Sequence, residues 1–306
     1  MSEKATVAVI AGPTAVGKTE VSLLVAERLG AEIVSADSMQ IYRGMDIGTA
    51  KPNQRERDRV PHHLVDMWEP KDELSVAEYQ RLARAAIADI ASRGKLPLLV
   101  GGSGLYLRAV VDDLRFPPTD PLVRARLDER ARSEGAQALF ENLRELDPVA
   151  AARIEPNNER RIVRALEVIE LTGRPFSEND AWSRFDSIYF LSIVGLDRNR
   201  DDLNERIDRR VVRMFQEGLR EEVARLGLVG RTARAALAYK QVLDRPEASD
   251  EELIAEISRA TRRFARRQLS WFRSDPRIVW LDAAQEHLEA QVVDYFVRSL
   301  TLRLHP

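Results

Sequence analysis

A glycine-rich segment near the start of the chain carries the residue types of a phosphate-binding loop (P-loop). It matches the pattern Gly-x4-Gly-Lys-Ser/Thr, and it lies between an apolar stretch and a helical pattern, as such a loop requires. Glycines let the backbone close around phosphate oxygens, and the N–H groups at the helix start favour an anion. We expect a di- or triphosphate to be bound by Gly12, Pro13, Thr14, Ala15, Val16, Gly17, Lys18 and Thr19.

Two side chains of this loop and one carboxylate outside it could do chemistry. Lys18 supplies a mobile positive charge, and the hydroxyl of Thr19 suits Mg²⁺. Most proteins with such a loop also have an acid at the end of a neighbouring apolar strand, but the apolar run 96–100 ends in two glycines and Ser103. This departure argues against an ordinary ATPase. The nearest carboxylate is Asp37, which follows another apolar run and would lie at the carboxyl edge of a sheet, where such folds bind ligands.

The N-terminal third of the chain alternates short apolar strands with helical patterns. Helical spacing of apolar residues predicts helices over 18–29 and 76–93. Fully apolar short strands between helices are typical of a parallel sheet that is covered on both faces. Strands are predicted at 6–11, 32–35, 63–66 and 96–100.

The pattern changes at about residue 116 and changes back near residue 187. Between these points the chain is nearly all helical, whereas an apolar, β-branched strand is predicted again at 187–196. We therefore predict an α/β fold with a P-loop NTPase-like parallel sheet core and an inserted, mainly helical domain. The predicted parts are the first part of the core at 1–116, the helical insertion at 117–186, and the rest of the core with basic C-terminal helices at 187–306. This last part is expected to hold helices at 201–226 and 251–272 and a strand at 278–281.

Composition sets the class of protein and its surroundings. The chain has 306 residues, 44% of them apolar, no cysteine and a net charge of -2, so whole-protein charge does not indicate a nucleic-acid partner. The segment Arg259–Arg277, however, holds seven arginines and one acid, either a solvated helix face or a surface for a phosphate backbone. No apolar run approaches the roughly 20 residues that span a bilayer. We expect a cytoplasmic monomer without disulfides or thiolate metal sites.

The order of short motifs along the chain resembles the tRNA dimethylallyltransferase family of bacterial type. These motifs extend over nearly the whole chain, so the resemblance does not depend on the phosphate-binding loop alone. After that loop they are Ser35–Tyr42, Asp46–Pro52, Pro61–Asp66, Val100–Tyr106, Pro156–Asn158, Arg161–Glu167 and Arg266–Trp271.

The resemblance implies that the loop holds the diphosphate of dimethylallyl diphosphate and that no phosphoryl group is transferred. The exocyclic amine of an adenosine beside the tRNA anticodon would attack the allylic carbon, and Lys18 with Mg²⁺ near Thr19 would stabilise the departing diphosphate. Asp37 matches the family's general base, a role typically worth about 10² to 10⁴ in rate. A strand-end cap or metal ligand is the alternative for this carboxylate. Arg206 matches an arginine that reaches the diphosphate from the far side, and Ser103 matches a hydroxyl that contacts the diphosphate or the amine.

The resemblance also implies where tRNA binds. A stacked adenine must be everted before it can react, so phosphate contacts elsewhere have to offset a few kcal/mol, as is typical of enzymes that flip bases. The basic helix around Arg262 and Arg266 has its arginines in rows at helical spacing. The full set of expected tRNA contacts is Asp37, Ser38, Met39, Gln40, Ser103, Arg124, Arg160, Arg161, Ile162, Val163, Arg164, Arg262 and Arg266.

The sequence departs from the family pattern at two positions and leaves three other functions open. Ser103 stands where many members carry threonine, which preserves the hydroxyl, and Ala238 stands where a glycine is common, which puts the local backbone in question. A small-molecule kinase would share the loop and use the insertion as a lid. A tRNA-binding protein with a vestigial loop would give no product. A relative that prenylates free adenine nucleotides would need neither the insertion nor the arginine-rich helix.

Overall fold

The computed structural model describes residues 4–178 and 184–304, and the chain divides into two compact units. Unit 1 joins Met1–Asp112 with Ser187–Pro306, and unit 2 is Asp113–Asp186. Within the described ranges, no helix is both long enough and apolar enough to cross a bilayer.

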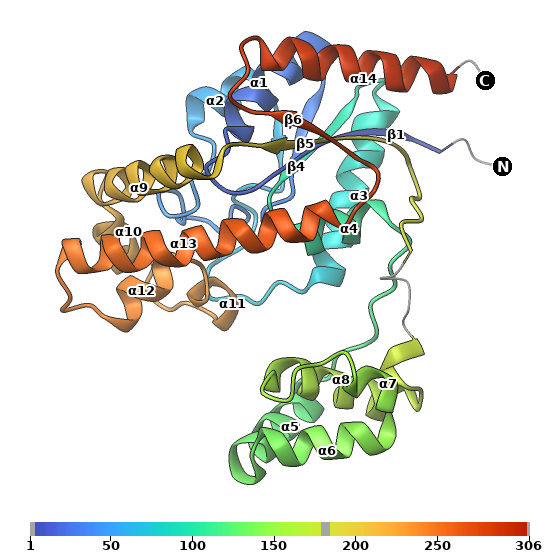
Figure 1. Ribbon diagram of the computed structural model, residues 1–306, viewed down its shortest axis with the longest axis vertical. Coiled ribbons are helices and arrows are strands. Elements are labelled where there is room, and N and C mark those ends of the chain that lie inside the picture. Colours follow the sequence, from blue (N-terminus) through green and yellow to red (C-terminus); the bar gives the residue numbers. More distant parts are fainter. Residues whose placement is uncertain (1–3, 179–183, 305–306) are drawn as a thin grey trace. The chain divides into compact units, whose positions relative to one another are not determined.

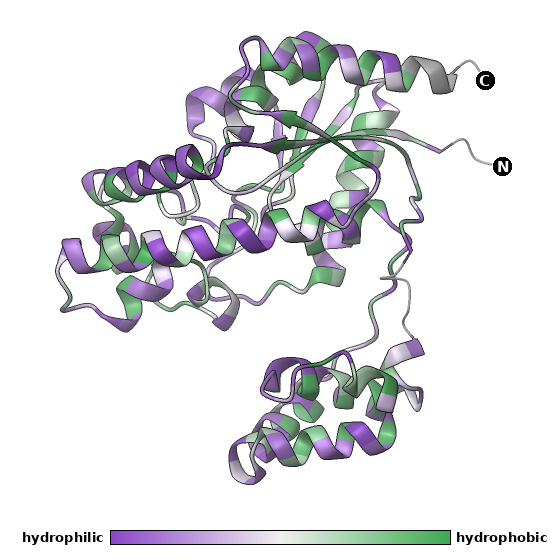
Figure 2. Ribbon diagram, viewed as in Figure 1, coloured by the Kyte–Doolittle hydropathy of each residue, from purple (hydrophilic) through white to green (hydrophobic). Residues whose placement is uncertain are grey.

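Unit 1 is built on a six-stranded, all-parallel sheet in the order β3-β2-β4-β1-β5-β6. The predicted α/β class with a parallel sheet is confirmed. Figure 2 shows the central strands coloured as hydrophobic, as expected for strands buried on both faces. The strands are β1 (Thr6–Ala11), β2 (Glu32–Ser35), β3 (His62–His63), β4 (Pro97–Gly101), β5 (Phe190–Asp197) and β6 (Ile278–Asp282).

Helices cover both faces of the sheet in unit 1. Figure 1 shows α1 and α14 on one face and α3 with α4 on the other. The long helix α13 packs against α9, α12 and α4. The helices of unit 1 are α1 (Lys18–Leu29), α2 (Gln54–Arg59), α3 (Val76–Ser92), α4 (Gly104–Val111), α9 (Arg200–Gln216), α10 (Leu219–Arg225), α11 (Arg231–Arg234), α12 (Tyr239–Asp244), α13 (Asp250–Arg273) and α14 (Leu288–Leu304).

Three elements differ from the sequence prediction. The strand expected at 63–66 is wrong, because Leu64 and Asp66 adopt positive φ and only His62–His63 pairs with the sheet. The single helix expected at 201–226 is two helices, since Gly218 at φ 93 separates α9 from α10. The helix α14, which packs against α1 and β5, was not predicted.

Unit 2 is entirely helical among its described residues and has a hydrophobic core of its own. Leu139, Leu143, Ile162 and Val163 are completely buried in it. Its helices are α5 (Pro121–Glu134), α6 (Ala136–Leu146), α7 (Pro148–Ala151), α8 (Glu159–Thr172) and a short 3₁₀ helix η1 (Phe176–Glu178).

A buried carboxylate anchors the β2–β3 edge of the sheet in unit 1. Glu32, at the start of β2, is 3% exposed and accepts hydrogen bonds from Arg93 and His63, with Lys95 Nζ 3.1 Å from its carboxylate. The hydrogen bonds from Arg93 hold the pKa of Glu32 well below its usual range, and they outweigh the opposite effect of burial. A lowered folded-state pKa stabilises the protein above the unfolded pKa of about 4.3, and this stabilisation is lost as the pH falls.

We therefore predict that Glu32→Gln lowers the free energy of unfolding at pH 7 by about 2 kcal/mol. The difference from the wild type should shrink as the pH falls below about 4, because the wild-type carboxylate then takes up protons more readily in the unfolded chain. Urea denaturation at several pH values measures both effects. Glu27→Gln, which removes an exposed partner of Arg59, is the control and should change little. A pH-independent difference for Glu32→Gln would contradict the prediction.

Candidate active site

Three strand ends meet at the carboxyl edge of the sheet in unit 1. β4 lies between β1 and β2, in a register that pairs Ala11 with Gly101 and Ser35 with Val100. A Cβ atom on Gly101 would lie 2.2 Å from the carbonyl oxygen of Ala36, so only glycine permits this approach. The loops after β1, β2 and β4 are thereby brought together, as is usual for ligand sites in open parallel sheets.

Residues 12–17 form a loop between β1 and α1, and Lys18 and Thr19 begin the helix, as the pattern predicted. Gly17 at φ 113 leads into α1, and no side chain caps the first N–H groups of that helix. Lys18 lies over the loop, and its Nζ donates to the carbonyl oxygens of Gly12 at 2.9 Å and Pro13 at 2.7 Å. The uncapped amides and the lysine together offer the donors that a phosphate group requires.

Lys18 lies in surroundings that disfavour its charge. Desolvation lowers the pKa of Lys18 to about 8, the nearby Asp37 counteracts this effect, and the positive charge of Arg210 adds to it. A lysine held between a like charge and a carboxylate is typical of functional sites.

Helix α9 adds two arginines to the loop. Arg206 Nε donates to the carbonyl oxygen of Ala15 at 2.9 Å, and Arg210 Nη1 donates to Thr14 Oγ1 at 2.8 Å. Desolvation lowers the pKa of both guanidinium groups, and the buried Nε of Arg210 has no hydrogen-bond partner among the described residues. The family resemblance indicated Arg206, whereas Arg210 was not predicted. The signal for Arg210 was its spacing of four residues from Arg206, which places both side chains on one face of a helix.

Asp37 follows β2 and uses only part of its hydrogen-bonding capacity. Its Oδ1 accepts from the backbone N–H of Met39 at 2.9 Å, while its Oδ2 has no hydrogen bond with a described residue. One oxygen therefore caps the turn, as the alternative interpretation expected. The other oxygen is free to accept a proton, as the general-base interpretation requires, or to bind a metal ion, as the alternative without proton transfer requires.

Two hydroxyl groups lie side by side next to Asp37. Ser103 is the N-cap residue of α4 but makes no side-chain cap, and its Oγ is 3.5 Å from the Oγ of Ser38. Ser38 directly follows Asp37, so this contact joins the loop after β2 to the loop after β4. Both residues belong to the predicted set, and the structure brings them together.

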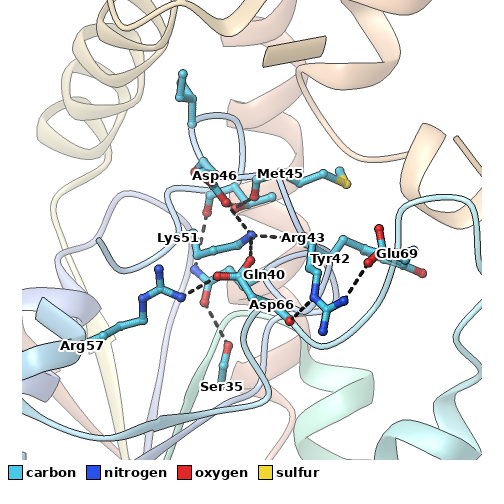
Figure 3. A network of polar contacts seen from close by, with 12 residues as sticks. Ser35, Gln40, Tyr42, Arg43, Met45, Asp46, Lys51, Arg57, Asp66 and Glu69 are labelled. Carbon is cyan, nitrogen blue, oxygen red and sulfur yellow. Dashed lines mark hydrogen bonds and ion pairs between the residues drawn. The ribbon is translucent and has the colours of Figure 1, made fainter. Parts of the chain in front are cut away.

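The loop that follows Asp37 is held by a network of polar contacts around the buried ammonium group of Lys51 (Figure 3). The ammonium group of Lys51, whose side chain is 2% exposed, donates to Asp46, Asp66 and the carbonyl oxygen of Tyr42, each at 2.6 Å. Gln40 was a predicted tRNA contact. Its side-chain amide is engaged within unit 1, where it accepts from Ser35 Oγ at 2.9 Å and donates to the carbonyl oxygen of Ala50 at 3.3 Å.

A second buried carboxylate fixes the same loop. Glu222 of α10 accepts from the consecutive backbone N–H groups of Asp46, Ile47 and Gly48 and from the hydroxyl of Tyr239. A Cβ atom on Gly48 would lie 2.4 Å from the ring of Tyr239. The loop after β2 is therefore attached to α10 and α12 as well as to the sheet.

The backbone conformation of Ala238, which precedes Tyr239, shows why a glycine would suit this position. It adopts φ 73 and ψ -51 at the N-cap of α12 and is buried. A residue with a Cβ atom is strained there by about 1–3 kcal/mol. The chain keeps the local backbone despite the strain, and the hydrogen bond from Ala238 N to Gln241 Oε1 at 3.0 Å supports it.

The predicted tRNA contacts of unit 2 fall into three groups. Ile162 and Val163 are completely buried in the core, so the predicted contact does not apply to these side chains. Arg164 donates to the carbonyl oxygens of Pro117 and Pro118 and pairs with Glu167. Arg124 also pairs with Glu167. The exposed residues are Arg160 and Arg161.

The two predicted contacts on α13 differ in their surroundings. Arg266 is exposed, whereas Arg262 is paired with Asp208 of α9 at 2.5 Å. Further exposed arginines lie along the same helix at Arg259, Arg263 and Arg267.

Possible metal ligands at this site are few. The hydroxyl of Thr19 lies at the start of α1 beside Lys18. No group of three or more His, Cys, Asp or Glu side chains suited to a metal ion occurs in the part of the chain that the structure describes. This donor set fits Mg²⁺ only where a bound phosphate supplies further oxygens, as Mg²⁺ sites commonly require.

Comparison with known proteins identifies the family. The model of the family described as IPP transferase matches residues 40–275. Two tRNA dimethylallyltransferases are similar along most of their length. That of Salinispora tropica is 54% identical, covering 94% of this chain and 92% of its own, and that of Bifidobacterium longum is 52% identical, covering 91% and 87%.

Solved structures agree with this assignment. The full-length tRNA isopentenylpyrophosphate transferase from Bacillus halodurans is 41% identical with a TM-score of 0.71, and the match covers 99% of this chain and 100% of that one. A eukaryotic dimethylallyltransferase described as acting on tRNA is 26% identical with a TM-score of 0.81, covering 99% and 80%. The chain belongs to the tRNA dimethylallyltransferase family of IPP transferases.

Proposed function

We propose that this chain transfers the dimethylallyl group of dimethylallyl diphosphate to the exocyclic amine of the adenosine immediately 3' of the anticodon in tRNA. The products are N6-isopentenyladenosine and diphosphate. One observation supports this reaction above all: Lys18 and Arg210 are bonded to the phosphate-binding loop, and the carboxylate of Asp37 lies near enough to both to counteract the desolvation that lowers their pKa. The reaction needs a base beside a group of anion-binding donors, because the amine loses a proton while diphosphate leaves.

The donor diphosphate would be held by the loop Gly12–Thr19. Lys18 would exchange its bonds to loop carbonyls for bonds to phosphate oxygens, and Arg206 and Arg210 would approach from α9. When bound at Thr19 and the diphosphate, Mg²⁺ would neutralise part of the charge on the leaving group. As the C–O bond to diphosphate breaks, negative charge grows on these oxygens, and cationic donors fixed in advance stabilise it.

The acceptor amine would enter from the side of Asp37 and Ser103. The amine nitrogen forms the new bond to the allylic carbon and loses one proton, which the open Oδ2 of Asp37 accepts. The hydroxyl of Ser103 would orient the amine or donate to the diphosphate. The adenine has to leave its stack to reach this point, as in other enzymes that act on a base.

A large RNA partner is supported by exposed arginines that have no acidic partner among the described residues. Arg263 and Arg266 of α13 and Arg160 and Arg161 of unit 2 are of this kind. Contacts of this type bind a phosphate backbone and weaken as salt rises. We also propose that the enzyme acts as a monomer in the cytoplasm, as the sequence analysis expected.

One experiment tests the reaction itself. Purified protein is mixed with dimethylallyl diphosphate, Mg²⁺ and bulk tRNA, and the digested nucleosides are analysed by mass for isopentenyladenosine. We expect product with tRNA and none with free adenine nucleotides. Phosphoryl transfer from labelled ATP to any acceptor would favour the kinase, and tRNA binding without product would favour a binding protein.

We predict that Asp37→Asn lowers kcat by about 10² to 10⁴, because the amide cannot take up the proton of the amine. Binding of the donor should be unchanged or slightly tighter, since a negative charge near the diphosphate is removed. Single-turnover kinetics and calorimetry with an unreactive thio-analogue of the donor separate the two effects. Asp72→Asn, which changes an exposed carboxylate, is the control. Weaker donor binding with an unchanged chemical step would make Asp37 a ligand of the donor instead of a base.

We predict that Arg210→Met lowers kcat/KM for the donor by about 10- to 100-fold, because a hydrogen bond to a charged group contributes about 1.5–3 kcal/mol. The matched control is Arg209→Met, which removes an exposed arginine from the adjacent position of α9. Equal effects of the two substitutions would assign the loss to general charge instead of a contact with diphosphate.

A further inference from the structure

A glutamine on the arginine-rich helix lies buried against the active-site loops. Gln268 of α13 is 8% exposed, whereas its neighbours Arg266 and Arg267 are exposed. The helix thus presents charged groups to solvent and one neutral amide to the interior. None of the roles proposed above uses this amide.

The two ends of the Gln268 amide connect two active-site loops. Its Oε1 accepts from the backbone N–H of Thr14 at 3.0 Å, and its Nε2 donates to the carbonyl oxygen of Gly102 at 2.8 Å. Thr14 belongs to the phosphate-binding loop, and Gly102 precedes Ser103. One rigid side-chain group therefore bridges the loop after β1 and the loop after β4.

The second loop is in close contact with α13 on both sides of Ser103. A Cβ atom on Gly102 would lie 2.5 Å from Nε2 of Gln268, and one on Gly104 would lie 2.1 Å from Cε3 of Trp271. Gln268 and Trp271 are three residues apart and share one face of the helix. The backbone around Ser103 is thus packed directly against α13.

The chemical character of the side chain suits this bridge. A side-chain amide offers a donor and an acceptor on one planar group and stays uncharged throughout the pH range in which proteins fold. Glutamate would lose the donor to Gly102, and methionine of similar length would lose both bonds. A carboxylate here would also add a negative charge near the diphosphate.

We propose that Gln268 is a positioning residue that fixes the phosphate-binding loop relative to Ser103, and so sets the donor carbon at attack distance from the acceptor amine. The inference rests on the proposed function, because only a reaction between two bound groups needs this separation to be fixed. Lys18 is bonded within its own loop and the exposed arginines lie on the opposite face of α13, so both binding surfaces should persist without Gln268. Misplacement of reacting groups by about 1 Å can lower a rate by about 10²-fold.

The test compares kcat with two binding constants in Gln268→Met. We expect kcat to fall by about 10- to 100-fold, while the Kd values for the unreactive donor analogue and for tRNA stay unchanged. The amide proton of Thr14, followed by NMR, should exchange faster because it has lost its acceptor. Gln216→Met, an exposed glutamine on α9, is the control for the substitution itself.

A second variant keeps the test decisive if Gln268→Met fails to fold. Gly102→Ala keeps the glutamine at position 268 but places a methyl group 2.5 Å from its Nε2, so the amide has to move and kcat should fall in the same selective way. Unchanged kcat in a folded variant, or a loss of donor affinity that accounts for the whole loss of rate, would overturn the positioning role. Absence of product from the wild type in the same assay would instead overturn the proposed function.

Discussion

Desolvated positive charge behind the phosphate-binding loop is the constraint on which the rest of unit 1 depends. Lys18 and Arg210 lie near each other in surroundings that lower the pKa of both, and the carboxylate of Asp37 opposes this only in part. Like charges gathered away from water oppose folding, so the surrounding structure has to hold them in place. An anion bound at the loop would relieve that repulsion, because it would place negative charge beside both cations.

Two buried side chains hold the loop that follows Asp37. Lys51 binds three oxygens behind the loop that follows Asp37, and Glu222 collects three consecutive amides of the same loop. Lys51 and Glu222 are both buried, so removal of the groups that bind either of them would leave an uncompensated charge. The contacts of Lys51 and Glu222 hold the loop in one conformation, which keeps Oδ2 of Asp37 near Lys18 and Arg210.

The sequence predicted those parts of the site that follow from local patterns. The spacing of glycines and Lys18 indicates a phosphate-binding loop wherever it occurs, and apolar strands alternating with helices allow few arrangements except a parallel sheet. Arg210 could not be recognised in this way, because a helical arginine resembles a surface arginine until tertiary packing buries it. Gln268 could not be recognised either, because only tertiary packing shows that it is buried. The two-residue strand β3 was misplaced because positive φ at Leu64 has no signal in residue type.

The two faces of α13 differ in charge, since one carries exposed arginines and the other the buried amide of Gln268. Its exposed arginines suit a phosphate backbone, and an arginine turned inward would add to the charge already held by Lys18 and Arg210. A neutral amide avoids that repulsion and still satisfies a buried N–H and a buried carbonyl, each of which would be costly to leave unpaired. The same helix can therefore carry exposed arginines on one face and contact the loop that holds Lys18 on the other, because Gln268, which makes that contact, carries no charge.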